Sequence, residues 1–349
     1  MNQRVGGLGR VRATIQDVAR KAGVTTGTVS RAFNNYPDIR PETRRRILDA
    51  AEELGYRPNI SARNLAGKRV PNIGLIISGI LEGDEKDIHA FQLLRGILAY
   101  TREKGLEMAM YATDSEMQAR ESYTDFCQRH SISGTIVCGI RTDDKYFEDL
   151  MRSGIPTVAI DFPVRTGNGG WVSVDNRAAA EDAVKTLLDS GHRNLLVMSG
   201  TESADVTQVR MQGVRDACAR TGYGLKDEMI LSGGYSQEEA YRRMKAYLAS
   251  GGERPDAVFC LSDLMALGVM DALKEAGLRI PEDVSVIGFD GIFIGDYSQP
   301  SLSTVEQDMC RMGREAARML ADLMQGAGAG GHLVLPYRLA LKGSFRSRI

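Results

Sequence analysis

The 349-residue sequence has no apolar run that approaches the roughly 18 residues needed to span a membrane. Its first residues, MNQRVGGLGRVRAT, lack the apolar core of a signal peptide. The five cysteines are scattered without a CxxC pair, and the four histidines are dispersed. These absences predict a soluble cytoplasmic protein with reduced thiols, no metal site and no cofactor.

Sequence motifs of common enzyme classes are also missing. The chain contains no GxxxxGK[ST] loop, no GxGxxG that follows a strand, no GxSxG turn and no HExxH helix. The sequence therefore supplies no nucleophile with a partnered base. We expect a protein that is not an enzyme. The alternative of an α/β enzyme predicts turnover of its ligand rather than reversible binding.

The net charge of −1 hides a strong asymmetry along the chain. Residues 1–69 contain 14 Lys/Arg and 6 Asp/Glu, a net charge of +8, whereas the remainder contains 30 and 39, a net charge of −9. A basic head on an acidic body indicates that the head binds a polyanion. The alternative is an ordinary solvated basic surface.

The head contains a helix, a tight turn and a second helix. Thr14 and Asp17 have the spacing of a capping box that starts a first helix, and Gly23 can end that helix at positive φ. Thr25 can then cap a short helix over residues 26–33. This order predicts a helix-turn-helix, although other helical hairpins share part of the pattern.

The second helix carries the polar residues expected of a helix that reads the major groove. Arg31 can contact a guanine with two donors, and Gly27 allows a close approach to DNA. The predicted base-reading residues are Thr26, Gly27 and Arg31. The predicted contacts to the DNA backbone are Thr14, Thr28, Ser30 and Asn34. A third helix begins at Pro41 and ends at Gly55.

The stretch RPNISARNLAGK (residues 57–68) offers about two turns of helix between Pro58 and Gly67. A helix this short is only marginally stable alone in water. Its one large apolar residue, Leu65, lies among polar neighbours. The segment therefore predicts a helix that needs an external partner to become ordered.

From residue 72 the chain alternates apolar runs with amphipathic stretches, which predicts parallel sheets covered by helices on both faces. The runs are NIGLII, LEMAMY, GTIVCGI, PTVAID, NLLVMS, AVFCLS and VSVIGFD. The expected helices lie near 91–104, 116–130, 143–153, 176–190, 207–221, 236–250 and 263–276. Nearly 280 residues exceed one core, so we expect two α/β lobes, with the glycine-rich residues 326–332 as a late crossover.

Ligands of such sheets bind beyond the carboxyl ends of the strands. The predicted effector-binding residues are Ser78, Asp161, Arg210, Tyr235, Ser262 and Asp290. The two aspartates follow apolar runs and can accept hydrogen bonds from hydroxyl groups, and Arg210 supplies only donors. Tyr235 can stack on a sugar face. Each aspartate can instead be a loop cap, and Asp263 is expected to cap the helix that it begins.

The segments TIQDVARKAGVTTGTVSRAFN, RRRILDAAEELGYRPN and SARNLAGK strongly resemble the LacI/GalR family of bacterial transcriptional regulators. The resemblance is specific over residues 13–68 and follows the general pattern over nearly all the rest. It implies a helix-turn-helix head, a hinge helix and an effector domain like the periplasmic sugar-binding proteins. It places Thr26, Gly27 and Arg31 on bases, Leu65 in the minor groove, and Ala62 at a small contact position one turn earlier.

The resemblance also places Asp161, Arg210, Tyr235, Ser262 and Asp290 at effector-contacting positions. The sequence departs from the usual pattern of this family at three places. Thr26 and Gly27 are smaller than the side chains of many members, Arg40 replaces a serine-type cap, and Ser262 replaces a frequent asparagine. The operator sequence and the effector therefore stay open.

The combined expectation is a small all-α head and hinge helix joined to an α/β two-lobed effector domain. We assign residues 1–12 to a basic arm, 13–57 to the DNA-binding domain, 58–70 to the hinge helix and linker, and 71–349 to effector binding and dimerisation. Within the hinge, Asn59, Ala62 and Leu65 are expected at the minor groove. The expected protein is a dimeric repressor of a pseudo-palindromic operator, switched by a sugar or another metabolite such as a nucleoside. The ending LKGSFRSRI has no leucine heptads, which favours a dimer over a tetramer. The alternative is a small-molecule binding protein that does not regulate DNA.

Overall fold

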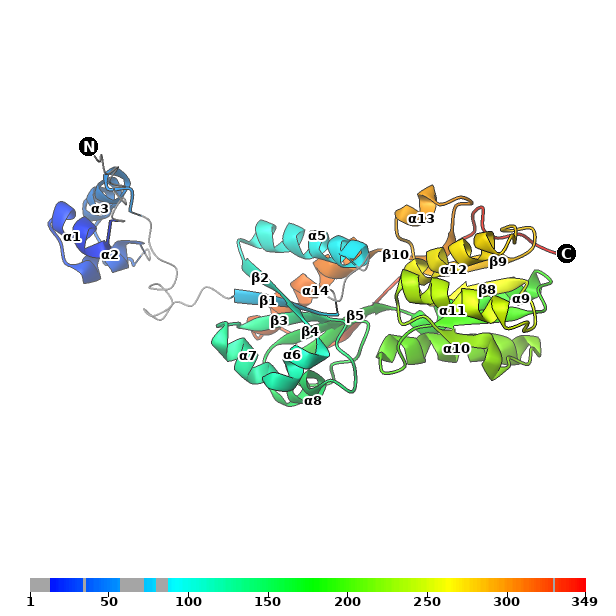
Figure 1. Cartoon of the computed structure of the whole chain (residues 1–349). Coiled ribbons are helices and arrows are strands. Elements are labelled where there is room, and N and C mark those ends of the chain that lie inside the picture. The colour runs from blue at the N-terminus through cyan, green and yellow to red at the C-terminus, as the bar shows by residue number, and fades with distance from the viewer. Residues whose placement is uncertain (1–12, 34–35, 57–71, 80–86, 329) are drawn as a thin grey trace, which may run out of the picture. The chain divides into compact units, whose positions relative to one another are not determined.

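Figure 1 shows the computed structural model of the chain, which describes residues 13–33, 36–56, 72–79, 87–328 and 330–349. The chain divides into two compact units, Met1–Val70 and Pro71–Ile349. These units are called the head and the body below.

The first two helices of the head begin as the sequence predicts. Helix α1 (Ile15–Ala22) starts at a capping box, in which the Thr14 hydroxyl accepts from the Asp17 amide at 3.3 Å and the Asp17 carboxylate accepts from the Thr14 amide at 2.9 Å. Gly23 ends this helix with a φ of 63°. The Thr25 hydroxyl accepts from the Thr28 amide at 3.2 Å at the start of α2 (Thr26–Phe33). Both predicted helix starts are confirmed.

Helix α3 (Pro41–Glu53) completes the head. Arg40 occupies its N-cap without a side-chain hydrogen bond to the helix, and Pro41 supplies the first helical residue. The buried apolar side chains of the three helices are Val18, Ala19, Ala22, Val29, Ala32, Ile47, Ala50 and Ala51. Because most of them are small or β-branched, the helices can pack closely around a small core.

The body contains two six-stranded sheets, one in each lobe (Figure 1). The first sheet has the order β11-β5-β4-β3-β1-β2, and the second has the order β12-β10-β9-β8-β6-β7. The strands of the first sheet are β1 (Asn72–Ser78), β2 (Glu107–Thr113), β3 (Gly134–Cys138), β4 (Thr157–Ile160), β5 (Gly169–Val174) and β11 (His332–Leu335). Those of the second are β6 (Leu195–Ser199), β7 (Ile230–Ser232), β8 (Ala257–Cys260), β9 (Ser285–Asp290), β10 (Ser303–Gln307) and β12 (Tyr337–Ala340). Only the pairing of β10 with β12 is antiparallel among these strands.

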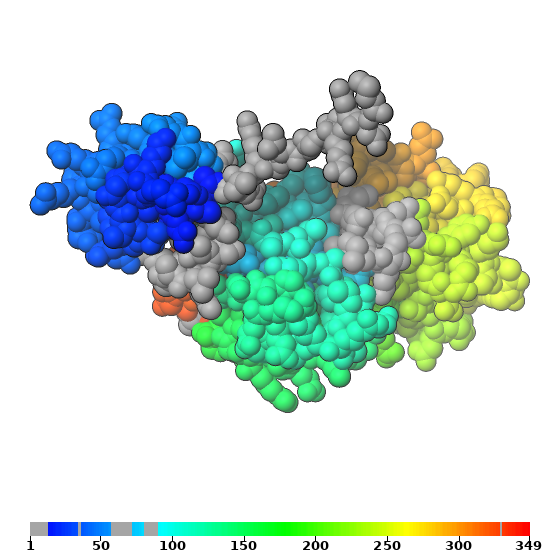
Figure 2. Space-filling model, turned by 60° about the vertical axis from the view of Figure 1, so that its left-hand side comes forward, coloured from blue at the N-terminus to red at the C-terminus, as the bar shows by residue number. Residues whose placement is uncertain are grey.

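Helices cover the sheets, as expected for parallel strands. The first lobe has α5 (Asp87–Lys104), α6 (Ser115–Arg120), α7 (Tyr123–Arg129), α8 (Lys145–Arg152) and α14 (Met309–Met324). The second has α9 (Asn176–Asp189), α10 (Asp205–Thr221), α11 (Gln237–Ala249), α12 (Asp263–Glu275) and α13 (Ile294–Tyr297), with a 3₁₀ turn at Asp227–Met229. In Figure 2 the part of the first lobe that precedes α9 is cyan to green, and the visible part of the second lobe is mostly yellow-green to orange. The expected two-lobed α/β body is confirmed.

The chain crosses between the lobes three times. It passes from β5 to α9 at residues 174–176, from β10 back to α14 at residues 307–309, and from β11 to β12 at residues 335–337. The glycine-rich segment was expected at a crossover, and this expectation is wrong. The segment connects α14 with β11, and both belong to the first lobe. β11 pairs with β5 there, and just before this pairing Gly331 accepts a hydrogen bond from the Trp171 amide of β5 at 2.9 Å.

Two glycines explain why α14, from late in the sequence, packs in the first lobe. A Cβ atom on Gly96 of α5 would lie 1.8 Å from the carbonyl oxygen of Cys310, and one on Gly313 of α14 would lie 2.1 Å from that of Leu93. The two helix backbones therefore touch, and any larger residue at either position would separate them.

The seven apolar runs all form strands, but β5, β7, β10, β11 and β12 were not predicted. Four of these have five residues or fewer, which is too short for a clear pattern, and β7, β11 and β12 lie at sheet edges. The expected helix over 116–130 is two helices, because Ser122 accepts from the Asp125 amide at 3.1 Å and caps the second one.

Among the described residues, no helix is long and apolar enough to cross a membrane. No group of three or more metal-ligating side chains occurs within the same residues. Burial raises the pKa of Cys127 to about 12 and that of Cys218 to about 11. Both thiols are therefore protonated and unreactive near neutral pH.

Candidate functional sites

The predicted base-reading residues lie together on the exposed side of α2. Thr26, Gly27 and Arg31 are all exposed, and Gly27 and Arg31 are one helical turn apart. A Cβ atom on Gly27 would meet only the Thr25 hydroxyl, at an ordinary 3.7 Å. The fold of the head therefore does not require glycine at this position, which is consistent with a role in close approach to a partner.

Arg31 has an acidic neighbour that the sequence analysis missed. Its guanidinium forms an ion pair with Asp38 at 2.5 Å and lies 5.3 Å from the centre of the Tyr36 ring. The side chains of Arg31 and Asp38 are 53% and 47% exposed. Asp38 follows Arg31 by seven positions along the chain, and no local pattern links them.

The predicted DNA-backbone contacts are partly engaged within the head. The Thr14 hydroxyl donates to the Asp17 carboxylate at 2.6 Å, and the Thr28 hydroxyl lies 2.9 Å from that of Thr25. Thr14 is exposed, whereas Thr28 and Ser30 are half-buried. The remaining predicted contacts, Asn34, Asn59, Ala62 and Leu65, lie outside the described residues, as do residues 1–12 and 57–71.

In the body, three of the six predicted effector residues join one hydrogen-bonded row. Asn176 donates to Asp161 at 3.0 Å and accepts from Nε of Arg210 at 2.9 Å. Nη1 of Arg210 lies 3.6 Å from Oδ1 of Asp290, which also accepts from Gln307 at 3.0 Å. The row, here called the polar row, is Asp161, Asn176, Arg210, Asp290 and Gln307.

The polar row links both lobes through their crossovers. Asp161 follows β4 of the first lobe, and Arg210 and Asp290 belong to the second lobe. Asn176 and Gln307 lie at two of the crossovers, and the sequence analysis missed both. Asn176 begins α9 two residues after β5, and Gln307 is the last residue of β10. Both positions can be recognised in the sequence only after β5 and β10 have been assigned.

Arg210 is the central and most buried member of the polar row. Its side chain is 4% exposed, and its Nη1 donates to the Leu261 carbonyl at 2.6 Å. The guanidinium carbon lies 3.6 Å from the centre of the Phe289 ring. These contacts hold the N–H donors of the Arg210 guanidinium in one orientation, so that the cation is already positioned before a ligand binds.

The other predicted effector residues make different contacts. The Tyr235 hydroxyl lies 2.8 Å from that of Thr207, and its ring fits only because residue 200 is glycine, where a Cβ atom would lie 2.1 Å from the ring. Ser78 accepts from Gln118 at 3.0 Å, and Ser262 caps α12 by accepting from the Met265 amide at 3.3 Å. The polar row therefore does not include these three residues, and their contact with an effector stays a prediction.

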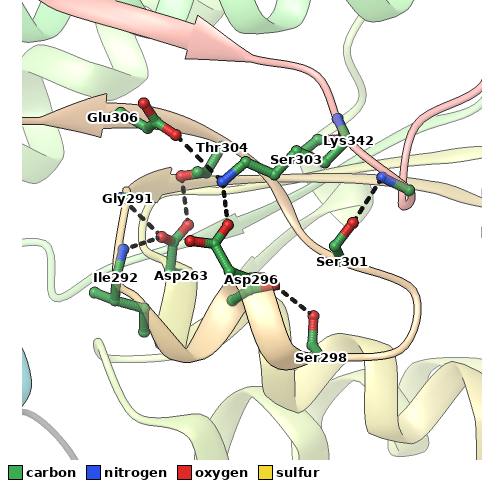
Figure 3. A network of polar contacts seen from close by, with 12 residues as sticks. Asp263, Gly291, Ile292, Asp296, Ser298, Ser301, Ser303, Thr304, Glu306 and Lys342 are labelled. Carbon is green, nitrogen blue, oxygen red and sulfur yellow. Dashed lines mark hydrogen bonds and ion pairs between the residues drawn. The ribbon is translucent and has the colours of Figure 1, made fainter.

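Asp263 does not cap its own helix, so that expectation is wrong (Figure 3). The cap is Ser262, and the buried Asp263 carboxylate instead accepts from Thr304 at 2.6 Å and from the amides of Gly291 and Ile292 at 2.8 and 2.9 Å. These amides directly follow Asp290. Asp263 thus fixes the backbone next to a member of the polar row, which itself has a φ of 128°.

Burial changes the protonation of these carboxyl groups. Desolvation and the nearby Asp290 raise the pKa of Asp263 to about 7, against its three hydrogen bonds. Desolvation likewise raises the pKa of Asp290 to about 7, despite the opposing effect of Arg210. Because the two carboxyl groups lie near each other away from water, the pair retains a proton at a pH where exposed aspartates are ionised.

A cavity of about 510 Å³ adjoins the polar row at Asp290 and Gln307. This volume is within the range of small-molecule sites. Other lining residues are Gln92, Phe293, Met309, Pro336 and Tyr337. In the described part of the chain, the buried Oε1 of Gln307 has no hydrogen-bond partner. A buried acceptor without a partner costs free energy unless a water or a ligand group donates to it.

Two family models match the chain. The model described as bacterial regulatory proteins of the lacI family matches residues 14–59, and the model described as a periplasmic binding protein-like domain matches residues 184–345. Catabolite control protein A of Priestia megaterium is 31% identical, and the match covers 96% of this chain and 99% of that protein. The HTH-type transcriptional repressor CytR of Escherichia coli K12 is 32% identical, with 96% and 97% coverage.

Solved structures of similar proteins match the fold over most of the chain. The lac repressor dimer bound to operator and the anti-inducer ONPF has a TM-score of 0.82 at 25% identity and covers 96% of this chain and 99% of that one. The complex of the transcriptional regulator CelR with cellobiose has a TM-score of 0.71 at 28% identity, with 96% and 100% coverage.

Proposed function

The chain belongs to the lacI family of bacterial regulatory proteins and is a DNA-binding transcription regulator, and from this premise we propose that it is a repressor switched by a small effector. The repressor binds a pseudo-palindromic operator as a homodimer in the cytoplasm. An uncharged, hydroxyl-rich molecule binds beside the polar row and changes the affinity for the operator. The polar row, which links the lobes through two crossovers, is the observation that carries this proposal.

The charge and surface of the head support operator binding. Residues 1–69 carry a net charge of +8, which attracts phosphates of any sequence. Thr26, Gly27 and Arg31 present one exposed face for base edges in the major groove. Thr14, Thr28, Ser30 and Asn34 position this face on the backbone, and Asn59, Ala62 and Leu65 bind the minor groove. Leu65 there wedges a base step open, which explains an apolar side chain among polar neighbours.

The chemistry of the polar row supports an uncharged effector with several hydroxyl groups. Asp161 and Asp290 supply acceptor oxygens, whereas the single cation of the polar row, Arg210, is already paired with Asp290. A phosphorylated ligand would bring negative charge to the two carboxyl groups of the polar row, whose guanidinium is already paired with Asp290. The similar regulator CelR was solved with cellobiose, which is a neutral sugar of this kind.

The position of the polar row supports a switch by population shift. A ligand that contacts Asp161 of the first lobe and Arg210 of the second favours one spacing of the lobes over others. The affinity for the operator changes by the difference in effector affinity between the two states. Crossover residues Asn176 and Gln307 are the members that experience this change most directly.

Exposed apolar side chains support a dimer. Phe91 and Met110 in the first lobe and Phe293 and Tyr297 in the second are each more than half exposed. Phe293 and Tyr297 adjoin, with 6.4 Å between their ring centres, and a contiguous apolar surface can bind a protein partner. Two identical chains related by a two-fold axis would present two heads to the two halves of a pseudo-palindrome.

Two measurements test the proposal. Affinity for random-sequence duplex should fall by orders of magnitude between about 50 and 200 mM salt, if each head neutralises several phosphates. A flat response would favour a small-molecule binding protein that does not regulate DNA. In a thermal-shift assay, glucose, ribose, cellobiose and adenosine are each compared with a phosphate ester. Stabilisation by a neutral member supports the proposed effector class, and stabilisation by phosphate esters alone would contradict it.

A further inference from the structure

Arg31 and Asp38 form a unit at the carboxyl end of α2. The ion pair uses Nη2 of Arg31 and Oδ2 of Asp38 at 2.5 Å, and the guanidinium also lies 5.3 Å from the centre of the Tyr36 ring. A guanidinium has five N–H donors in a planar fork. One of them points to Asp38, so four remain for a base.

The backbone on both sides of Asp38 is tied to the helices. The Tyr36 amide donates to the Arg31 carbonyl at 3.1 Å, and the Ile39 amide donates to the Tyr36 carbonyl at 3.3 Å. Arg44 of α3 donates to the same Tyr36 carbonyl at 2.6 Å. These bonds hold the carboxylate of Asp38 beside the end of α2 rather than on a freely moving loop.

An acidic residue at this place opposes the general attraction of the head to DNA. The head carries a net charge of +8, and a carboxylate next to a base-reading arginine weakens the pull of nearby phosphates. The ion pair itself is half-exposed, and such pairs stabilise a fold very little. Stability therefore does not explain Asp38, whereas a requirement for one orientation of Arg31 does.

We propose that Asp38 is a positioning residue for base reading, which directs the Arg31 guanidinium to a base edge and so sets the preference for guanine at one base pair of each half-site. The proposal rests on the proposed function. Asp38 acts in two ways. Its carboxylate orients the guanidinium of Arg31, and its negative charge makes the same guanidinium less attractive to the DNA phosphates. Without Asp38, Arg31 would turn to the backbone, so that binding would become tighter on random DNA and less selective.

The experiment uses the full-length chain and a pool of duplexes with randomised half-sites. Bound duplexes are sequenced for the unchanged protein, for Arg31→Ala and for Asp38→Asn. Arg31→Ala identifies the base pair that Arg31 reads. We expect Asp38→Asn to lower the preference at that base pair about tenfold, to leave the other positions unchanged, and to raise affinity for random duplex a few-fold.

Asp49→Asn is the matched control, because it makes the same change of charge in the head. Asp49 is exposed on α3 and lies beside Lys21 and Glu53 rather than Arg31. It should raise affinity for random duplex to a similar extent without any change of preference. In the double variant Arg31→Ala/Asp38→Asn, the second change should have no further effect at the identified base pair.

Two outcomes would overturn the proposal. One is an unchanged preference in Asp38→Asn, and the other is a loss of preference that is equal in Asp49→Asn or spread over all positions. Failure of the proposed function looks different, because the unchanged protein would then enrich no sequence at all. Circular dichroism melting of each variant confirms that the head remains folded.

Discussion

The predicted base-reading surface of the head is local and exposed, because Thr26, Gly27 and Arg31 lie within six residues of one another. The polar row of the body comes from distant parts of the chain. Four of its residues lie at the ends of strands or helices, and the fifth, Arg210, lies inside a helix and is almost fully buried. The first surface is open to a large polyanion. The second is largely satisfied by its own hydrogen bonds and ion pair, apart from Oε1 of Gln307. Substitutions in the head should therefore change binding with little effect on stability, and substitutions in the polar row should change both.

The largest expected difference is in stability. Arg210→Ala would leave Asp290 buried without its cation and remove the donors to Asn176 and Leu261. We expect the free energy of unfolding to fall by about 3–5 kcal/mol, against less than about 1 kcal/mol for Arg31→Ala. Urea denaturation followed by circular dichroism measures both. Equal losses of unfolding free energy in Arg210→Ala and Arg31→Ala would contradict the expectation that the polar row is more important for stability than the surface of the head.

The next effect is on DNA recognition. Arg31→Ala should weaken binding to the preferred operator by about 1–3 kcal/mol, since a bidentate contact to guanine is lost. Binding to random duplex should change much less. Electrophoretic mobility shifts on both duplexes, with Arg20→Ala as an exposed control on α1, test this expectation. If Arg31→Ala weakens both duplexes equally, Arg31 contacts a phosphate instead.

The raised pKa values in the body predict a dependence of stability on pH. Between the ordinary pKa of an aspartate, 3.8, and about 7, the folded state retains a proton that the unfolded state releases. The contribution of the pair to the free energy of unfolding must therefore fall as pH rises through this window, by at most about 1.4 kcal/mol per pH unit for one proton.

Asp290→Asn should flatten this dependence, and Asp271→Asn, at an exposed position on α12, should leave it unchanged. Urea denaturation at several pH values between 4 and 8 measures the slopes. A slope in Asp290→Asn equal to that of the unchanged protein would show that the pair does not retain the proton.

The smallest expected effect separates folding from binding within the head. Gly27→Ala introduces a Cβ atom that makes only an ordinary contact of 3.7 Å with the Thr25 hydroxyl, and it improves helix propensity, so α2 should gain up to about 1 kcal/mol of stability. The same methyl group should weaken operator binding, because it stands between the helix backbone and the DNA. Differential scanning calorimetry and mobility shifts measure the two effects. A gain in stability with unchanged binding would show that close approach is not the reason for glycine.

Most of the head could be predicted from the sequence because its structure is local. Thr14 and Asp17 lie three residues apart and satisfy each other, and Gly23 supplies the positive φ that ends α1. In the body, buried strands could be predicted from apolar runs. Helix α14 was not among the expected helices, although it has an apolar repeat at Met309, Met312, Ala316 and Leu320. Its place in the first lobe could not be predicted, since it depends on the contact with α5.

The candidate sites divide in the same way. The sequence by itself determined the family resemblance, the charge asymmetry, and the roles expected of Arg31, Arg210 and Asp290. Only the tertiary structure decided that Asn176 and Gln307 complete the polar row, that Asp263 anchors the chain after Asp290, and that Asp38 faces Arg31. The physical reason is that a cap or a helix face depends on neighbours along the chain. The partner of a buried carboxylate depends on which strand ends and loops the fold brings together.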